Sequence, residues 1–195
     1  MELSILIPTV VERKYRFYPL YANLLQQAKD KPVEVLYLSD NKELPIGTKR
    51  QQLLEMAQGR FIVFFDDDDT PANNYVDLIL QAITEPLVDC VGIRVKMTTN
   101  GNNPQICLHR FKHPMAEGMA AAKYGVDYVR PITHFNPVLR VKALQAGFGN
   151  ERFGEDAAYW SRVNPLLSCE YYIPEILFDY NYSNLQPHNQ KYGIK

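Results

Sequence analysis

Residues 1–85 alternate between short apolar runs and segments whose apolar positions recur at helical spacing. The runs 3–7, 33–38 and 61–65 are rich in β-branched and aromatic residues, which is typical of buried strands. The segments 15–29 and 47–58 carry their apolar residues on one helical face, and a third helix is expected from Pro71 to about Ile83. This order predicts a parallel sheet with right-handed crossovers.

The second half of the chain has a less regular pattern. Residues 88–97 and 104–108 are predicted strands around a turn at 99–103, which indicates a hairpin. Residues 110–135 are irregular, and the small residues at 116–122 suit either a short helix or a mobile loop. Next come a strand or helix start at 138–141 and a helix that residues 154–156 precede and that ends at about 163. Strands at 169–173 and 176–182 are followed by a polar tail at 183–195.

Composition narrows the class of protein. The chain has 195 residues, 46% of them hydrophobic, and a net charge of -1, which suits one folded domain and excludes wholesale disorder. No apolar run is long enough to span a membrane, and the first residues carry no basic leader. Cys90, Cys107 and Cys169 have no paired spacing, so we expect reduced thiols and a cytoplasmic protein.

Charge is unevenly distributed along the chain. Residues 1–93 hold 14 acidic and 9 basic residues, whereas residues 94–142 hold 8 basic and 2 acidic residues. The basic middle segment also contains His109, His113 and His134. An acidic first half therefore precedes a basic middle.

Four consecutive aspartates, Asp66 to Asp69, directly follow the predicted strand at 61–65. Thr9 and Asp40 end the other two predicted strands, so all these polar groups would share one edge of the parallel sheet, where α/β proteins bind ligands. Closely packed carboxylates repel one another and need a cation, and oxygen ligands suit Mg²⁺ or Mn²⁺. The alternative for the acidic run is a solvated turn.

Several motifs in this order resemble those of a family 2 glycosyltransferase with the GT-A fold. The matching pieces are Ser4–Thr9, Ile46–Arg50, Gly59–Asp69 and Gly147–Asp156. The resemblance implies a Rossmann-like, mostly parallel sheet flanked by helices, with a smaller mixed acceptor-side sheet. It further implies a single domain, 1–195, with a nucleotide-sugar half at 1–93 and an acceptor half at 94–195, of a size that suits a small bacterial or phage enzyme.

The resemblance assigns the acidic run to a DxD motif that binds a divalent metal, Mn²⁺ or Mg²⁺. It implies that Asp66 and Asp68 are metal ligands and that Asp66 and Asp67 also contact the donor. Because all four residues are aspartates, a second register, Asp67 and Asp69, remains open. His188 is a candidate third ligand, by analogy with the C-terminal histidine of many GT-A enzymes, and a lone surface histidine is the alternative.

Further donor contacts are implied at the same sheet edge. Pro8 and Thr9 resemble the family's contact with the nucleotide base, and Asp40 resembles the carboxylate that reads base or ribose. The alternative for Asp40 is a residue that forms a turn. Lys49 and Arg50 begin a predicted helix, where two cations and a helix N-terminus suit phosphates. The alternative is that Lys49 and Arg50 are ordinary charged residues on the exposed face of the helix.

Glu155 and Asp156 match the family's ED motif. The resemblance implies that Asp156 is the base that deprotonates the acceptor hydroxyl in an inverting transfer, supported by Glu155. The alternative is ordinary acidic residues at a helix start. Trp160, one helical turn further, could stack on an acceptor ring or pack in the core.

The basic middle segment lies where the family builds its acceptor site. Arg110 and Lys112 flank an aromatic residue, a pattern that can bind a phosphate-bearing acceptor such as nucleic acid, a lipid-linked phosphate or a phosphorylated glycan. The alternative is a solvated face that offsets the acidic half. Either a large acceptor or a partner chain would complete the site.

The sequence therefore predicts transfer of a sugar from a nucleoside diphosphate, UDP by resemblance, to a hydroxyl group. A nucleotidyltransferase is the first alternative, but residues 10–14 lack the glycine-rich loop expected after its first strand. A module of the same fold that binds metal or sugar-nucleotide without turnover is the second alternative.

Overall fold

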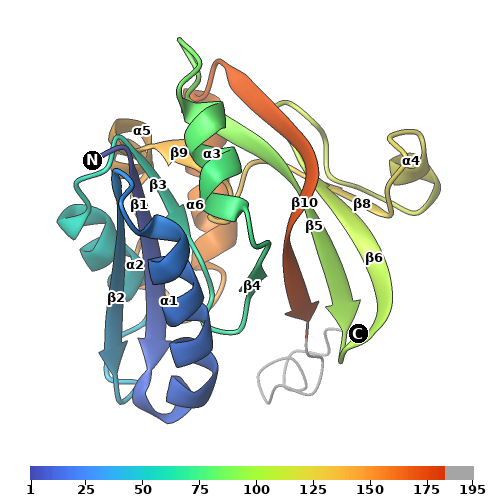
Figure 1. The fold of residues 1–195 in the computed structure, drawn as a ribbon. Helices are drawn as coiled ribbons and strands as arrows, with labels where there is room; N and C mark the ends of the chain where they lie inside the picture. Colours follow the sequence, from blue (N-terminus) through green and yellow to red (C-terminus); the bar gives the residue numbers. More distant parts are fainter. Residues whose placement is uncertain (183–195) are drawn as a thin grey trace.

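The computed structural model describes residues 1–182, which form one 10-stranded sheet with helices on both faces (Figure 1). The strand order is β2-β1-β3-β9-β5-β6-β8-β7, and β10 pairs with β4 and β5. The expected mixed α/β fold, with a parallel sheet in the first half of the chain, is confirmed. No helix within residues 1–182 is long and apolar enough to cross a membrane.

The first half of the chain follows the predicted order closely. Its elements are β1 (Leu3–Val10), the 3-10 turn η1 (Val11–Arg13), α1 (Lys14–Ala28), β2 (Val33–Asp40), α2 (Ile46–Met56), β3 (Phe61–Phe64), β4 (Thr70–Pro71) and α3 (Tyr75–Ile83). Leu3 on β1 pairs in parallel with Val33 on β2 and Phe61 on β3. The carboxyl ends of the three strands therefore share one edge, as predicted.

The start of the third helix differs from the prediction. Pro71 lies in β4 rather than in the first turn of a helix, and α3 begins at Tyr75. β4 pairs with β10, where Pro71 is opposite Phe178. A proline is tolerated there because the two-residue strand needs few backbone hydrogen bonds, so the missing N–H group of proline costs little.

The second half contains β5 (Cys90–Thr99), β6 (Asn102–His109), β7 (Ala116–Glu117), α4 (Met119–Ala122), β8 (Tyr128–Arg130), β9 (Val138–Leu139), α5 (Arg140–Ala146), α6 (Glu155–Val163), η2 (Asn164–Leu166) and β10 (Glu170–Tyr182). β5 and β6 form the predicted antiparallel hairpin. The two predicted late strands are one strand, β10, whose register against β5 shifts between Tyr172 and Phe178. Pro174 and Glu175 lie in this irregularity, so a proline that resembles a strand break is accommodated inside the strand.

A very short strand joins the two halves into one sheet. Val138 on β9 pairs with Ile62 of β3 and with Cys90 of β5, both antiparallel. The mixed part of the sheet is therefore continuous with the parallel part and not a separate smaller sheet. Figure 1 shows the long strands β5, β6 and β10 on the opposite side of β9 from β1 and β2.

Side chains alternate between two hydrophobic clusters on opposite faces of the sheet. Phe61 and Val63 of β3 belong to the cluster under α1 and α3, whereas Ile62 and Phe64 belong to the cluster under α2, α5 and α6. All four side chains are at most 1% exposed. This burial on both faces explains why the strand appears in the sequence as an uninterrupted apolar run.

Cys90, Cys107 and Cys169 form no disulfide, and the first two are buried. Burial raises the pKa of the Cys90 and Cys107 thiols, the latter to about 12. Both thiols therefore stay protonated at neutral pH, as expected of core cysteines.

A buried carboxylate fastens the beginning of β10 to α5. Asp89 is 2% exposed and accepts hydrogen bonds from Lys142 Nζ (2.7 Å), Ser168 Oγ (2.6 Å) and the Cys169 N–H (3.1 Å). Burial alone would raise the pKa of Asp89, but Lys142 and Ser168 outweigh it and lower that pKa below its usual value. The carboxylate is therefore ionised and stabilising in the folded chain.

Replacement of this carboxylate should weaken the fold in a pH-dependent way. Asp89→Asn should lower the free energy of unfolding at pH 7 by about 3 kcal/mol, because it leaves Lys142 without its ionised partner. Since the folded-state pKa lies below the unfolded value of about 4, this stabilisation is complete above that pH and is lost as pH falls.

Urea unfolding of Asp89→Asn and wild type at pH 7 and pH 3 measures this difference. The difference in the free energy of unfolding between the two proteins should be smaller at pH 3 than at pH 7. The exposed Asp77→Asn variant is the control and should change stability little at either pH. A difference that stays constant with pH would contradict the assignment.

Candidate active site

A cleft of about 1080 Å³ opens at the shared carboxyl edge of β1 and β3. Residues at the edge of β1 and β3 form one wall of the cleft. Residues at the beginning of α6 and on β5, β6, β8 and β10 form the rest of its lining. Eight of the predicted site residues line it: Pro8, Arg50, Asp66, Asp67, Asp68, Glu155, Asp156 and Trp160. The sheet edge predicted to bind a ligand is therefore hollowed.

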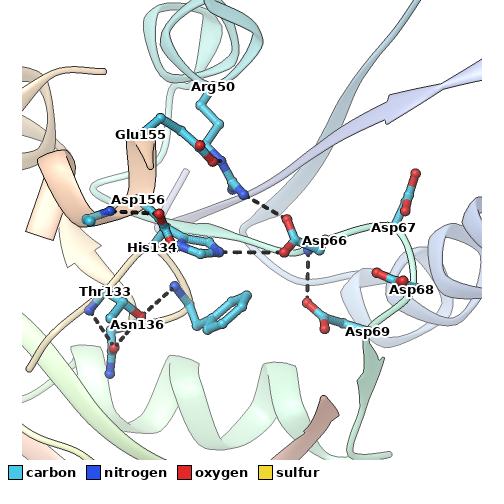
Figure 2. A network of polar contacts seen from close by, with 12 residues as sticks. Arg50, Asp66, Asp67, Asp68, Asp69, Thr133, His134, Asn136, Glu155 and Asp156 are labelled. Carbon is cyan, nitrogen blue, oxygen red and sulfur yellow. Dashed lines mark hydrogen bonds and ion pairs between the residues drawn. The ribbon is translucent and has the colours of Figure 1, made fainter. Parts of the chain in front are cut away.

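The four aspartates form a closed turn directly after β3. The Asp69 N–H donates to the Asp66 carbonyl (3.1 Å), and the Asp66 N–H donates back to Asp69 Oδ2 (2.9 Å). This reciprocal pair directs Asp66 toward α2 and α6, with Asp67 and Asp68 on the far side of the turn (Figure 2). We call residues Asp66 to Asp69 the carboxylate turn.

Arg50 on α2 links the carboxylate turn to α6. Its Nη2 donates to Asp66 Oδ1 (2.7 Å) and its Nε to Glu155 Oε1 (3.3 Å), and its side chain is 3% exposed. Burial alone would raise the pKa of Asp66, but Arg50 and His134 outweigh it and hold that pKa well below its usual range. The pair is therefore ionised.

The position of Arg50 depends on a close backbone approach at the beginning of α2. Gly47 donates its N–H to the Glu151 carbonyl (3.1 Å), and a Cβ at position 47 would lie 2.2 Å from the Gly149 carbonyl oxygen. Only glycine fits there without a backbone shift. Helix α2 is thereby packed against the loop that precedes α6, which brings Arg50 to Glu155.

Asp67 and Asp68 are neutralised by arginines from the segment that follows β1. Arg13 Nη2 lies 2.8 Å from Asp67 Oδ1 and 2.7 Å from Asp68 Oδ2, and Arg16 Nη1 lies 3.0 Å from Asp68 Oδ2. Thr9 Oγ1 donates to Asp67 Oδ2 (2.6 Å). Burial raises the pKa of Asp67, although the Thr9 hydrogen bond and Arg13 oppose it. These arginines supply the positive charge that the sequence led us to expect from a metal.

Asp69 provides an independent test of whether the carboxylate turn fits a cation. It is 4% exposed, and its Oδ1 is buried without a hydrogen-bond partner. Burial and the nearby charge of Asp66 raise its pKa well above the usual value. Carboxylate oxygens suit a hard divalent ion, but within residues 1–182 no three His, Cys, Asp or Glu side chains are arranged to hold one. The donor chemistry fits a metal, but the side chains are not preassembled around one.

The opposite wall carries the two residues of the ED motif, in different surroundings. Gly154 precedes α6 with a φ of 77°, a left-handed conformation that suits glycine. Glu155 is buried against Arg50, whereas Asp156 is half-buried, lines the cleft and accepts the Ala157 N–H at Oδ1 (2.8 Å). Trp160 lines the cleft as well.

Three predicted donor residues, Thr9, Asp40 and Lys49, lie beside the cleft and not in its lining. Lys49 is 2% exposed, forms an ion pair with Asp40 and donates to the Thr9 carbonyl (2.7 Å). Asp40 also accepts the Leu44 N–H (2.7 Å). Burial alone would raise the pKa of Asp40, but the contacts with Lys49 and with the Leu44 N–H outweigh it and lower that pKa. Asp40 thus occupies the turn-forming position considered as its alternative, and Lys49 fastens it to the end of β1.

The predicted acceptor residues Arg110 and Lys112 do not line the cleft. Arg110 Nε donates to Glu170 Oε2 (2.6 Å), and its guanidinium lies 4.1 Å from the centre of the Tyr172 ring. Lys112 Nζ lies 4.8 Å from the centre of the Phe111 ring. His188, the predicted third metal ligand, lies outside the described residues.

Sequence reasoning missed Arg13, Arg16 and His134, which all line the cleft. The two arginines directly follow the first strand, so their position near its end was a usable signal. His134 lies in an irregular segment and comes to β3 because Phe64 donates its N–H to the His134 carbonyl (3.0 Å). Its ring is buried without a hydrogen-bond partner, and Nε2 lies 3.8 Å from Asp66 Oδ2 (Figure 2).

Comparison with known families finds one match. The model of "Glycosyl transferase family 2" matches residues 19–146, about two thirds of the chain. No curated protein matches by sequence.

Solved structures similar to the chain include S. aureus TarS 1-349 in complex with UDP-GlcNAc, with a TM-score of 0.64 and 17% identity, over 93% of this chain and 58% of that one. Glucosyl-3-phosphoglycerate synthase from Mycobacterium tuberculosis, in complex with Mg²⁺ and UDP, has a TM-score of 0.53 and 14% identity, over 93% of this chain and 70% of that one. The chain thus spans about 58% of the TarS fragment's length, and at these identities the likeness concerns the fold.

Removal of the Arg50 charge should destabilise the whole site. Arg50→Met leaves Asp66 and Glu155 without their buried cation, so we expect a loss of about 3 kcal/mol in the free energy of unfolding. Lys96→Met is the matched control, because Lys96 forms an ion pair with Asp179 near the surface and should cost less than about 1 kcal/mol. Urea unfolding at pH 7 compares the two variants, and equal losses would contradict a central role for Arg50.

Proposed function

The chain belongs to glycosyl transferase family 2, and we propose that it transfers a sugar from a nucleoside diphosphate donor to an acceptor hydroxyl. The observation that carries the proposal is the cleft at the carboxyl edge of β1 and β3. The carboxylate turn forms one wall, and Asp156 lies on the other. A donor diphosphate and an acceptor hydroxyl can therefore occupy the same cleft.

UDP is the proposed nucleotide. The structures of TarS with UDP-GlcNAc and of glucosyl-3-phosphoglycerate synthase with UDP, both of the same fold, support this choice. Pro8 and Thr9, at the end of β1, are the proposed contacts to the base, with Asp66 and Asp67 on the ribose and diphosphate side. Asp40 and Lys49 would act on the donor indirectly, because they hold the end of β1 through the Thr9 carbonyl.

A divalent ion, Mn²⁺ or Mg²⁺, is the proposed cofactor of the carboxylate turn. Asp66 and Asp68 would hold it, or Asp67 and Asp69 in the second register. When bound, the ion would neutralise the diphosphate and the charge that develops on the departing nucleoside diphosphate. The unpartnered Oδ1 of Asp69 supports a cation there, and the Mg²⁺ in a structure of the same fold is consistent with it. His188 stays a prediction.

Asp156 is the proposed base in an inverting displacement. Its half-buried carboxylate at the beginning of α6 would take the proton from the acceptor hydroxyl as the oxygen attacks the anomeric carbon. Glu155 would act through Arg50, because the Arg50–Glu155 contact ties the beginning of α6 to the carboxylate turn. Trp160, which lines the same cleft, would contact the acceptor.

An anionic acceptor is predicted from the basic middle segment of the sequence. Arg110 and Lys112, the basis for an anionic acceptor, lie outside the cleft lining. Lys96, Arg110 and Arg130 each form an ion pair with a carboxylate. A nucleic acid or a phosphate-bearing glycan or lipid therefore stays a sequence-based prediction. Insensitivity of transfer to salt and to charge reversal at Arg110 and Lys112 would contradict it.

A panel of sugar-nucleotides tests the proposed donor class. Each nucleoside diphosphate sugar is added to the protein with and without Mn²⁺, and the thermal unfolding midpoint is measured. Because a ligand stabilises the state it binds, a UDP-sugar at about 100 times its Kd should add about 2.7 kcal/mol of stability. The absence of any shift across the panel would overturn the proposed donor class, and a shift that does not depend on the metal would overturn the proposed cofactor.

Asp156→Asn separates catalysis from binding. We expect it to lower the transfer rate by a factor of about 10² to 10⁴, since the amide cannot accept the proton. Donor binding, measured by the same thermal shift, should be retained. Asp77→Asn, which changes an exposed carboxylate in the first turn of α3, should leave transfer unchanged. Full transfer by Asp156→Asn would exclude this residue as the base, and no transfer by wild type despite donor binding would favour a non-catalytic module.

A further inference from the structure

We propose that Arg13 and Arg16 form a displaceable latch over Asp67 and Asp68, and that the released arginines bind the diphosphate of the donor. We call these two residues the arginine latch. The second half of the inference rests on the proposed function, whereas the first half concerns the carboxylate turn and a cation alone. The latch would make the binding of cation and diphosphate mutually reinforcing.

The latch contacts both possible metal registers of the carboxylate turn. One nitrogen, Arg13 Nη2, lies within 2.8 Å of Asp67 and 2.7 Å of Asp68, and Arg16 adds a contact to Asp68 of 3.0 Å. Asp68 belongs to the register with Asp66, and Asp67 to the register with Asp69. In either register a divalent ion therefore competes with Arg13 for the negative charge of at least one carboxylate.

Solvent exposure separates the latch from the permanent counter-ion of the turn. The side chains of Arg13 and Arg16 are 34% and 40% exposed, whereas that of Arg50 is 3% exposed. Asp68 is 29% exposed, and ion pairs near the surface contribute little to stability, so their exchange is inexpensive. Asp67 is 3% exposed, so Arg13 would leave it only as the cation takes its place. Loss of a buried pair is costly. Arg50 would therefore stay on Asp66 while Arg13 and Arg16 exchange partners.

Unsatisfied atoms around Asp66 indicate independently that this wall of the cleft receives a polar ligand. Asp69 Oδ1, Arg50 Nη1 and both ring nitrogens of His134 are buried without hydrogen-bond partners. Buried polar atoms are ordinarily paired, so each exception needs an explanation, and a bound ion or ligand is one. The set includes an acceptor for a cation and donors for an anion, as a metal diphosphate requires.

The released arginines would find an anion in the same cleft. Arg13 and Arg16 both line it, next to the carboxylates that they leave. Guanidinium groups suit phosphate oxygens because they offer several N–H donors in a planar fork. A diphosphate that draws the arginines away exposes Asp67 and Asp68 to the cation, and a cation that occupies these carboxylates frees the arginines. By linkage, each ligand should increase the affinity for the other by the same factor.

Binding of Mn²⁺ alone tests the first half of the inference. Isothermal titration compares wild type with Arg13→Gln, Arg16→Gln and the double variant. We expect Arg13→Gln to tighten Mn²⁺ binding about tenfold, because the competing charge on two carboxylates is gone and screening moderates its effect. Arg152→Gln is the control: Arg152 lines the same cleft but donates to the Lys42 and Glu43 carbonyls, so Mn²⁺ affinity should not change.

Binding of UDP tests the second half. With saturating Mn²⁺, the double variant should bind UDP about tenfold more weakly than wild type, since two diphosphate contacts are lost. In wild type, UDP should tighten Mn²⁺ binding, and this coupling should be smaller in the double variant. Circular dichroism and the thermal unfolding midpoint check that each variant is folded.

The outcomes separate the latch from the proposed function. Unchanged or weaker Mn²⁺ binding by folded Arg13→Gln would overturn the latch, as would UDP binding without any Mn²⁺ binding in wild type and variants. Tighter Mn²⁺ binding by the variant, with no UDP-sugar bound by any form, would support displacement but overturn the proposed donor. Unchanged UDP affinity in the double variant would overturn the diphosphate role of the arginines.

Discussion

The buried contact of Arg50 with Asp66 and Glu155 is the interaction on which the candidate site depends. It joins three segments that are distant in the sequence: the beginning of α2, the turn after β3 and the beginning of α6. A buried guanidinium is expensive unless its charge is compensated, so the two carboxylates must stay close to it. The same contact therefore fixes the distance between the two walls of the cleft. The close approach of Gly47 to Gly149 makes that geometry possible.

Charge compensation also explains why four adjacent aspartates can exist in a folded chain. Asp66 is neutralised from inside the protein by Arg50, and Asp67 and Asp68 from the solvent side by Arg13 and Arg16. The two kinds of counter-ion differ mainly in exposure. Burial makes the first permanent, whereas exposure leaves the others free to change partners. A carboxylate turn can thus be stable without a cation and still bind one.

The local sequence pattern predicted much of the fold. The spacing of apolar residues and the length of apolar runs distinguish a strand buried on both faces, such as β3, from an amphipathic helix, such as α1. It failed where pairing partners decide the outcome: Pro71 lies in a strand because β10 is beside it, and Pro174 stays within β10 because a bulge absorbs it. The carboxylate turn, Arg50 and Asp156 were found by motif, and the structure brings them to one cleft. The ion pairs of Lys49 and Arg110 were not predictable, since their carboxylates lie 9 and 60 residues away in the chain.

The ED motif shows how packing divides two neighbouring carboxylates between different tasks. Glu155 and Asp156 are adjacent at the beginning of one helix, where the dipole favours both negative charges. On a helix, consecutive side chains point about 100° apart, so the two carboxylates have different surroundings although both residues line the cleft. Glu155 takes the buried direction, where its Oε1 lies 3.3 Å from Arg50 Nε. Asp156 is half-buried and lines the cleft, and its place on the helix is held by the contact of its neighbour Glu155 with Arg50.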